Sequence, residues 1–192
     1  MADNSLVRGQ NHIFQVEKST VPYLCLYALL YAALTLSAYF LPTGEFLLRP
    51  GAALLVLAGA IHGPLVGFGA GLLGGFIADL AQNMVWLHWD LGLGVMGGFC
   101  GLYCYWVGVE EEQRLTLKAT GKLMLLAVVG SFSGMFLAGL VDLLLGAPPL
   151  IAFYAWALPA ALVNAFFGAI FGPLLFAGWL WMGRINAQVG NF

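Results

Sequence analysis

The chain has 192 residues, of which 61% are hydrophobic and only 8% charged, with a net charge of −2. Soluble domains carry about 25% charged residues, so a water-soluble protein of this size would have too little interior for so much apolar surface. The composition therefore indicates an all-α integral membrane protein. Nucleic acid is excluded as a partner, because no basic patch is present.

Six apolar stretches approach the length of about 20 residues that a membrane-spanning helix needs. We expect spans at 21–40, 48–61, 65–82, 91–109, 123–145 and within 151–182, with residues 83–90 as a polar and aromatic loop. The last stretch is too long for one straight crossing, so either a proline (Pro159 or Pro173) kinks it or its first turns lie in the outer interface. Residues 1–20 then form a cytoplasmic N-terminal lead, 21–183 the transmembrane domain and 184–192 a cytoplasmic tail.

The basic residues predict the orientation of these six spans. With both termini inside the cell, only Arg49 lies outside, and the cytoplasmic basic residues are Arg8, Lys18, Arg114, Lys118, Lys122 and Arg184. Cytoplasmic segments carry an excess of Lys and Arg. The N and C termini are therefore expected in the cytoplasm.

A ladder of glycines marks the third span. Gly63, Gly67, Gly71 and Gly75 recur at a stride of four and lead to Asp79. On a helix these positions form one stripe, and in lipid a stripe of small residues marks a close helix–helix contact. A carboxylate is expensive near a membrane, so the stripe predicts tight packing with a polar site at one end.

These motifs resemble the substrate-binding S components of energy-coupling factor (ECF) transporters. The resemblance rests on Arg49-Pro50-Gly51, on Gly63-Pro64-x-x-Gly67-Phe68, on the glycine stripe to Asp79 and on Trp89-Asp90-Leu91-Gly92-x-Gly94. Its specific part covers residues 49–101. Relatives with this loop often carry Asn after the Gly of Trp-x-x-Gly, where this chain has Leu93, and a ligand contact made by that Asn would be lost here.

The resemblance implies a six-helix bundle that is not an enzyme and has no cofactor or metal of its own. Such a subunit binds a vitamin or related micronutrient in a pocket open to the outside of a prokaryotic plasma membrane. Its partners are a transmembrane T component and two ATPases, which use the ATP and topple the subunit so that the pocket faces inward. The family's docking signature, an Ala-x-x-x-Ala step in the first span, is matched by Ala28 and Ala32, although such a pair also arises by chance in an Ala-rich span.

Most of the unusual polar and aromatic residues gather at the outer side. The candidate substrate-binding residues are Arg49, Asp79, Asn83, Trp86, His88, Trp89, Asp90, Asp142, Tyr154, Trp156 and Asn164. Aromatic walls with a few polar groups suit a flat heterocyclic ligand. Each residue also has a structural interpretation: the tryptophans as interface residues, Arg49 as an ion-pair partner of Asp79, Asp90 or Glu45, and Asp142 and Asn164 as hydrogen-bonding groups within the bundle.

Two other functions stay open at this point. A stand-alone carrier or channel needs intramembrane charge, which is scarce here, and an intramembrane enzyme would rest on Asp79 and Asp142, which lie in no recognisable catalytic motif. No nucleotide-binding Walker sequence is present. The ligand is not readable from the residues: riboflavin, a thiamine precursor, a tetrapyrrole and cobalamin all suit the aromatic content.

Overall fold

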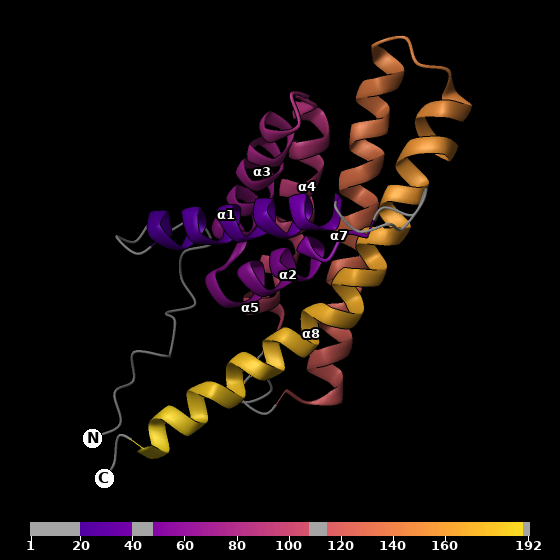
Figure 1. Ribbon diagram of the computed structural model, residues 1–192. Coiled ribbons are helices and arrows are strands. Elements are labelled where there is room, and N and C mark those ends of the chain that lie inside the picture. The colour runs from indigo at the N-terminus through magenta and orange to yellow at the C-terminus, as the bar shows by residue number, and fades with distance from the viewer. Residues whose placement is uncertain (1–19, 40–47, 108–114, 190–192) are drawn as a thin grey trace.

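The computed structural model describes residues 20–39, 48–107 and 115–189, and all of its regular elements are helical. They are α1 (Thr20–Tyr39), α2 (Gly51–His62), α3 (Pro64–Ala81), α4 (Leu87–Gly101), α5 (Tyr103–Trp106), α7 (Leu117–Leu144), η2 (Leu150–Ala157) and α8 (Leu158–Val189) (Figure 1). The expected N-terminal lead lies outside the described residues, as do Glu45 and Arg114.

Four helical segments are long and apolar enough to cross a membrane: Thr20–Ala38, Pro64–Ala81, Leu117–Leu144 and Leu150–Arg184. The expected spans 48–61 and 91–109 also contain helices, but α2 has only 12 residues and α4 only 15. The structure thus confirms a helical protein with several membrane-spanning helices. Six crossings and cytoplasmic termini stay predictions.

The helices pack in a row with α4 near its centre. Helix α4 lies between α3 and α7, α7 packs against α8, and the short α2 lies against α3, α4 and α8. Helix α1 runs across α3 and α2 at the edge of this row (Figure 1). The first turn of α4 therefore faces α3 on one side and α7 on the other.

Glycines bring the backbones on both sides of α4 into contact. A Cβ atom on Gly67 of α3 would collide with the carbonyl oxygen of Gly97 in α4, and one on Gly134 of α7 would collide with the carbonyl oxygen of Gly92. Such close approach favours van der Waals packing, which is the main attraction between helices in lipid. Helix α4 is thus held tightly on two faces.

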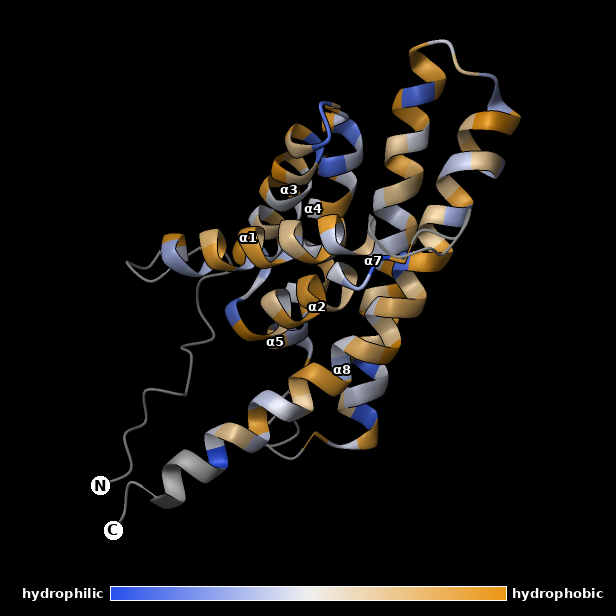
Figure 2. Ribbon diagram, in the orientation of Figure 1, coloured by the Kyte–Doolittle hydropathy of each residue, from blue (hydrophilic) through white to orange (hydrophobic). Residues whose placement is uncertain are grey.

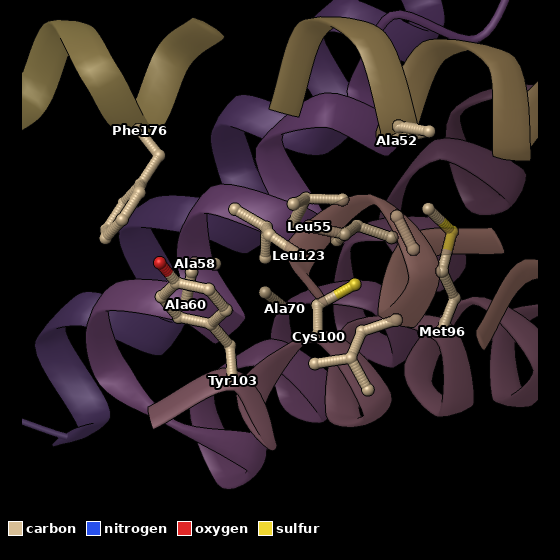
Figure 3. Packing of buried hydrophobic residues seen from close by; sticks show 14 of the residues in the cluster. Ala52, Leu55, Ala58, Ala60, Ala70, Met96, Cys100, Tyr103, Leu123 and Phe176 are labelled. Atoms are coloured by element: carbon tan, nitrogen blue, oxygen red, sulfur yellow. The ribbon is translucent and has the colours of Figure 1, made fainter. Parts of the chain in front are cut away.

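The buried apolar residues lie where α2, α4, α7 and α8 meet. Tyr103 and Phe176 pack edge to face with ring centroids 5.5 Å apart, and Leu55, Leu123 and Met96 are further members of the same buried cluster (Figure 3). Figure 2 shows mostly hydrophobic residues along the long helices and hydrophilic ones where α3 ends and α4 begins. The polar site is therefore at an end of the bundle.

Helix α4 differs from the expected fourth span at both ends. It begins at Leu87, so Trp89 and Asp90 lie in its first turn and not in a loop, because their N–H groups bond to the Trp86 carbonyl at 2.8 and 3.2 Å. It ends at Gly101, which lies directly against Pro64 of α3, and α5 follows as a separate turn. Hydropathy marks the apolar stretch but not these backbone bonds.

The last expected span is π-helical at its start. Leu150–Ala157 has π-helical geometry, and α8 then runs without interruption through Pro173 to Val189. Neither Pro159 nor Pro173 ends the helix. The change of helical geometry instead comes just before Pro159, at the boundary between η2 and α8.

Candidate functional site

Asp142 connects the end of α7 to the start of α4. Its side chain is buried, its Oδ1 atom lies 2.7 Å from Nε2 of His88, and its Oδ2 atom accepts a hydrogen bond from Nε1 of Trp89 at 3.1 Å. Since a carboxylate only accepts, Nε2 of His88 carries the hydrogen. We call these three residues the Asp142 clamp. Both of its carboxylate oxygens are engaged, and hydrogen bonds to a charged group are the strong kind.

Asp79 organises the turn between α3 and α4. Its Oδ2 atom accepts the backbone N–H of Trp86 at 2.8 Å, and its carbonyl oxygen accepts the N–H groups of Gln82 and Met84 at 3.0 Å. Asn83 within this turn is exposed and has a φ of 57°, a conformation that Asn tolerates better than most residues. Asp79 thereby fixes where α4 starts.

Asp90 lies on the opposite side of α4 from the Asp142 clamp. It is only 2% exposed, and its Oδ1 atom occupies space that a side chain at Gly75 of α3 would need. Its Oδ2 atom is buried and has no hydrogen-bond partner among the described residues. A buried acceptor without a donor costs free energy, which makes Asp90 the least satisfied carboxylate of the site.

Arg49 lies just before α2 and is partly buried. Its charge acts on Asp79 and on Tyr31, but within the described residues it forms no ion pair with Asp79 or Asp90 at 4.0 Å or less. Tyr31 is 2% exposed and packs against Gly51 and Gly74. Tyr31 is not among the site residues that the sequence predicts. It lies three positions after Ala28, which places both residues on one face of α1.

Three of the other candidates lie apart from these groups or only touch them. Tyr154 and Trp156 are 68% and 45% exposed on η2, which packs on α7 through Ala152 and Ala157. Trp86 is half exposed, with its ring edge-on to His88 at a centroid distance of 6.1 Å. The two η2 aromatics therefore do not join the Asp142 clamp in this structure.

Asn164 lies deeper, at the interface of α8 and α7. It is fully buried, its Nδ2 donates to Sδ of Met135 at 3.4 Å, and its Oδ1 atom has no partner among the described residues. Met135 in turn reaches the α4 backbone at Gly92. Asn164 thus approaches the same helix interface as the Asp142 clamp, from further inside the bundle.

The predicted docking residues Ala28 and Ala32 lie on the buried face of α1, and their role in docking stays a prediction. Both are buried, at 1% and 3% exposure, and the carbonyl oxygen of Ala28 lies against Gly74 of α3. These alanines therefore serve the contact of α1 with its own bundle, and a partner could reach them only if α1 moved.

The glycines of the stripe all lie at close contacts with α4. Gly67 and Gly71 face the α4 backbone, Gly75 faces Asp90, and Gly63, with a φ of 88°, forms the turn between α2 and α3 beside Gly101. That φ value favours glycine. Helix α3 can therefore lie close enough to α4 for Asp79 to bond to Trp86.

Asp79 and Asp142 lie on different sides of α4, so they do not form a catalytic pair. Within the described ranges no cluster of three or more His, Cys, Asp or Glu side chains could hold a metal ion. What the residues offer is a set of fixed acceptors and aromatic rings at one end of the bundle.

Known proteins similar to this chain agree with a transport role. The family model described as "ECF-type riboflavin transporter, S component" matches residues 17–179. A UPF0397 protein of Vibrio atlanticus is 30% identical over 81% of this chain and 87% of its own length, and one of Aliivibrio fischeri is 31% identical over 80% and 85%. A UPF0397 protein of Lactobacillus delbrueckii subsp. bulgaricus is 30% identical over 64% and 67%.

No solved structure matches the chain. The family model nevertheless spans α1 to most of α8, including the Asp142 clamp and Asp90. This chain therefore belongs to the family of S components of ECF-type riboflavin transporters, substrate-binding subunits of multi-pass membrane transporters.

Proposed function

We propose that this chain captures a vitamin or related micronutrient at the outer face of a prokaryotic plasma membrane, as the S component of an ECF-type importer. The observation that carries the proposal is the Asp142 clamp, which fixes His88 and Trp89 at the end of a bundle that belongs to this family. Preorganised polar groups beside aromatic rings are typical of small-molecule sites.

The packing of α4 supports delivery by movement of the whole subunit. Because α3, α4 and α7 meet backbone to backbone at Gly67, Gly97, Gly92 and Gly134, bending this part of the bundle would separate tightly packed surfaces. A toppling motion keeps these contacts intact. The energy for it comes from partner ATPases, because the chain has no nucleotide-binding Walker sequence.

Docking with the T component involves the outward face of α1 unless that helix moves. This face carries Leu26, Leu29 and Leu30, which are about half exposed, and the small residue Ala33. Ala28 and Ala32 lie on the other face. In lipid a docking surface of this kind gains from close packing and not from apolar burial alone.

Reconstitution of the chain with a T component and two ATPases in liposomes tests the proposal. The expected result is ATP-dependent uptake of the small molecule that co-purifies with the chain, and no uptake by the chain alone. If the chain neither assembles with the ATPase complex nor retains a small molecule, the proposal is wrong. Uptake by the purified chain alone would instead indicate a stand-alone carrier.

A further inference from the structure

A second group of charged side chains lies on the α3 side of α4, outside the Asp142 clamp. It contains Tyr31 of α1, Arg49 before α2, Asp79 of α3 and Asp90 of α4. Tyr31 packs against Gly51 and Gly74, and Oδ1 of Asp90 lies against Gly75, one helical turn before Asp79. We call these four residues the Asp90 cluster. Four successive elements of the chain meet in it.

The cluster has an unused acceptor at its centre. Asp90 is only 2% exposed, and its Oδ2 atom has no hydrogen-bond partner among the described residues. Its Oδ1 atom lies at Gly75, one helical turn before Asp79 on the same face of α3. The Asp90 carboxylate therefore points across the α3–α4 interface, toward the face that carries Asp79.

Neither carboxyl group of the cluster is paired with its guanidinium. Arg49 forms no ion pair with Asp79 or Asp90 at 4.0 Å or less in the described part of the chain. Arg49 is also only partly buried, so its long side chain can turn toward water. His88 gives no help, because its Nε2 atom faces Asp142.

We propose that the Asp90 cluster receives a cationic nitrogen of the transported molecule, as in an amidinium or a protonated amine. In this arrangement an N–H group of the ligand donates to Oδ2 of Asp90, Asp79 adds attraction, and the Tyr31 ring is an aromatic neighbour of the cation. Arg49 supplies the positive charge of the cluster in the absence of ligand, and it turns outward when the ligand binds. The inference rests on the proposed transport function and names its substrate class.

The Asp142 clamp is not the acceptor for this nitrogen. Both of its carboxylate oxygens already receive donors from the protein, at 2.7 and 3.1 Å. A ligand cation would have to displace one of them, whereas Oδ2 of Asp90 has no donor to lose among the described residues. Recognition of charge thus belongs to the α3 side of α4.

Three probes of nearly the same shape test this on the full chain in detergent: benzamidine (cation), benzamide (neutral) and benzoate (anion). The expected result is thermal stabilisation by benzamidine at lower concentration than by either other probe. Asp90→Asn should weaken the benzamidine effect about tenfold or more, as loss of a hydrogen bond to a charged group does. Ser131→Ala serves as control: it removes a buried hydroxyl that bonds, among the described residues, only to the Ala127 carbonyl of its own helix at 2.7 Å, so it should keep the ratio of benzamidine to benzamide affinity.

Arg49→Gln gives a result of opposite sign. Removing the competing positive charge should strengthen benzamidine binding severalfold, whereas a site built for anions would lose benzoate binding in the same variant. Equal protection by the three probes would overturn the proposal. So would a preference of the wild-type chain for benzoate that disappears in Arg49→Gln.

Mass spectrometry of the co-purified molecule separates this inference from the transport proposal. A molecule with a positively charged nitrogen at neutral pH supports the Asp90 cluster as its receptor. A neutral or anionic molecule overturns the inference while leaving assembly and ATP-dependent uptake intact. Failure of assembly would count against the importer itself.

Discussion

Asp142 of α7 and Asp90 in the first turn of α4 are both buried carboxylates, and only Asp142 has donors on both oxygens. Asp142 receives N–H donors on both oxygens, while one oxygen of Asp90 has no donor among the described residues. Leaving a buried acceptor unpaired costs about 1–3 kcal/mol. The difference indicates that Asp142 stabilises the contact between α4 and α7, whereas Oδ2 of Asp90 can still accept a hydrogen bond.

The comparison also shows how one turn of helix serves two sites. His88 and Trp89 point to α7, and the next residue, Asp90, points to α3. Successive residues of an α-helix are rotated by about 100°, so adjacent residues face different neighbours. The glycines on both faces of α4 bring α3 and α7 close enough to be reached.

The largest effect is expected from Gly134→Leu, which would disrupt the contact between α4 and α7 on which the Asp142 clamp depends. A side chain here collides with the Gly92 carbonyl oxygen, so α4 and α7 must separate and the Asp142 clamp must open. We expect a loss of about 3 kcal/mol or more in the free energy of unfolding, measured by denaturation in mixed micelles. Gly121→Leu on the same helix is the control, because nothing lies within 4 Å of its Cβ position. Equal stability of the two variants would contradict backbone contact between α4 and α7.

Asp142→Ala should have the next largest effect. It leaves the Nε1–H group of Trp89 and the ring nitrogen of His88 without their acceptor, at a cost of about 2–4 kcal/mol in unfolding free energy. The tryptophan fluorescence should also change, because Trp89 loses its acceptor. The same change should be absent when Asp142→Ala is made in a Trp89→Phe background. Unchanged stability would mean that Asp142, like Asp90, is not a structural group.

Trp89→Phe removes a single donor from the clamp and keeps the aromatic ring. Because Oδ1 of Asp142 retains His88, the expected loss is only about 1 kcal/mol, seen as a small shift in thermal unfolding. Combining it with Asp142→Ala completes a double-mutant cycle. Additive losses would show that the 3.1 Å bond carries no energy of its own.

The smallest change in stability is expected for Asp90→Asn. No donor in the described residues loses its acceptor at Oδ2, and the repulsion between Asp90 and Asp79 disappears. The unfolding free energy should therefore stay within about 1 kcal/mol of the parent or rise, in contrast to Asp142→Ala. A loss as large as that of Asp142→Ala would indicate that Asp90 is a structural carboxylate.

Much of the site could be predicted from residue type and spacing. The stride of Gly67, Gly71 and Gly75 marks the contact face of α3, and Asp79, Asp90 and Asp142 are conspicuous as acids in apolar surroundings. The membrane class follows from composition alone. Residue spacing is a local feature and composition is a sum over the chain, so both can be read from the sequence before folding.

Other features were decided only by how the helices rotate and pack. The pairing of Asp142 with His88 joins residues 54 positions apart, Ala28 and Ala32 lie on the buried face of α1, and α4 begins at Leu87 because Asp79 holds the turn before it. Spacing fixes which side chains share a helix face, but not which neighbour that face meets. The neighbour is determined by the glycine backbone contacts of α4 with α3 and with α7, and these contacts exist only in the packed structure.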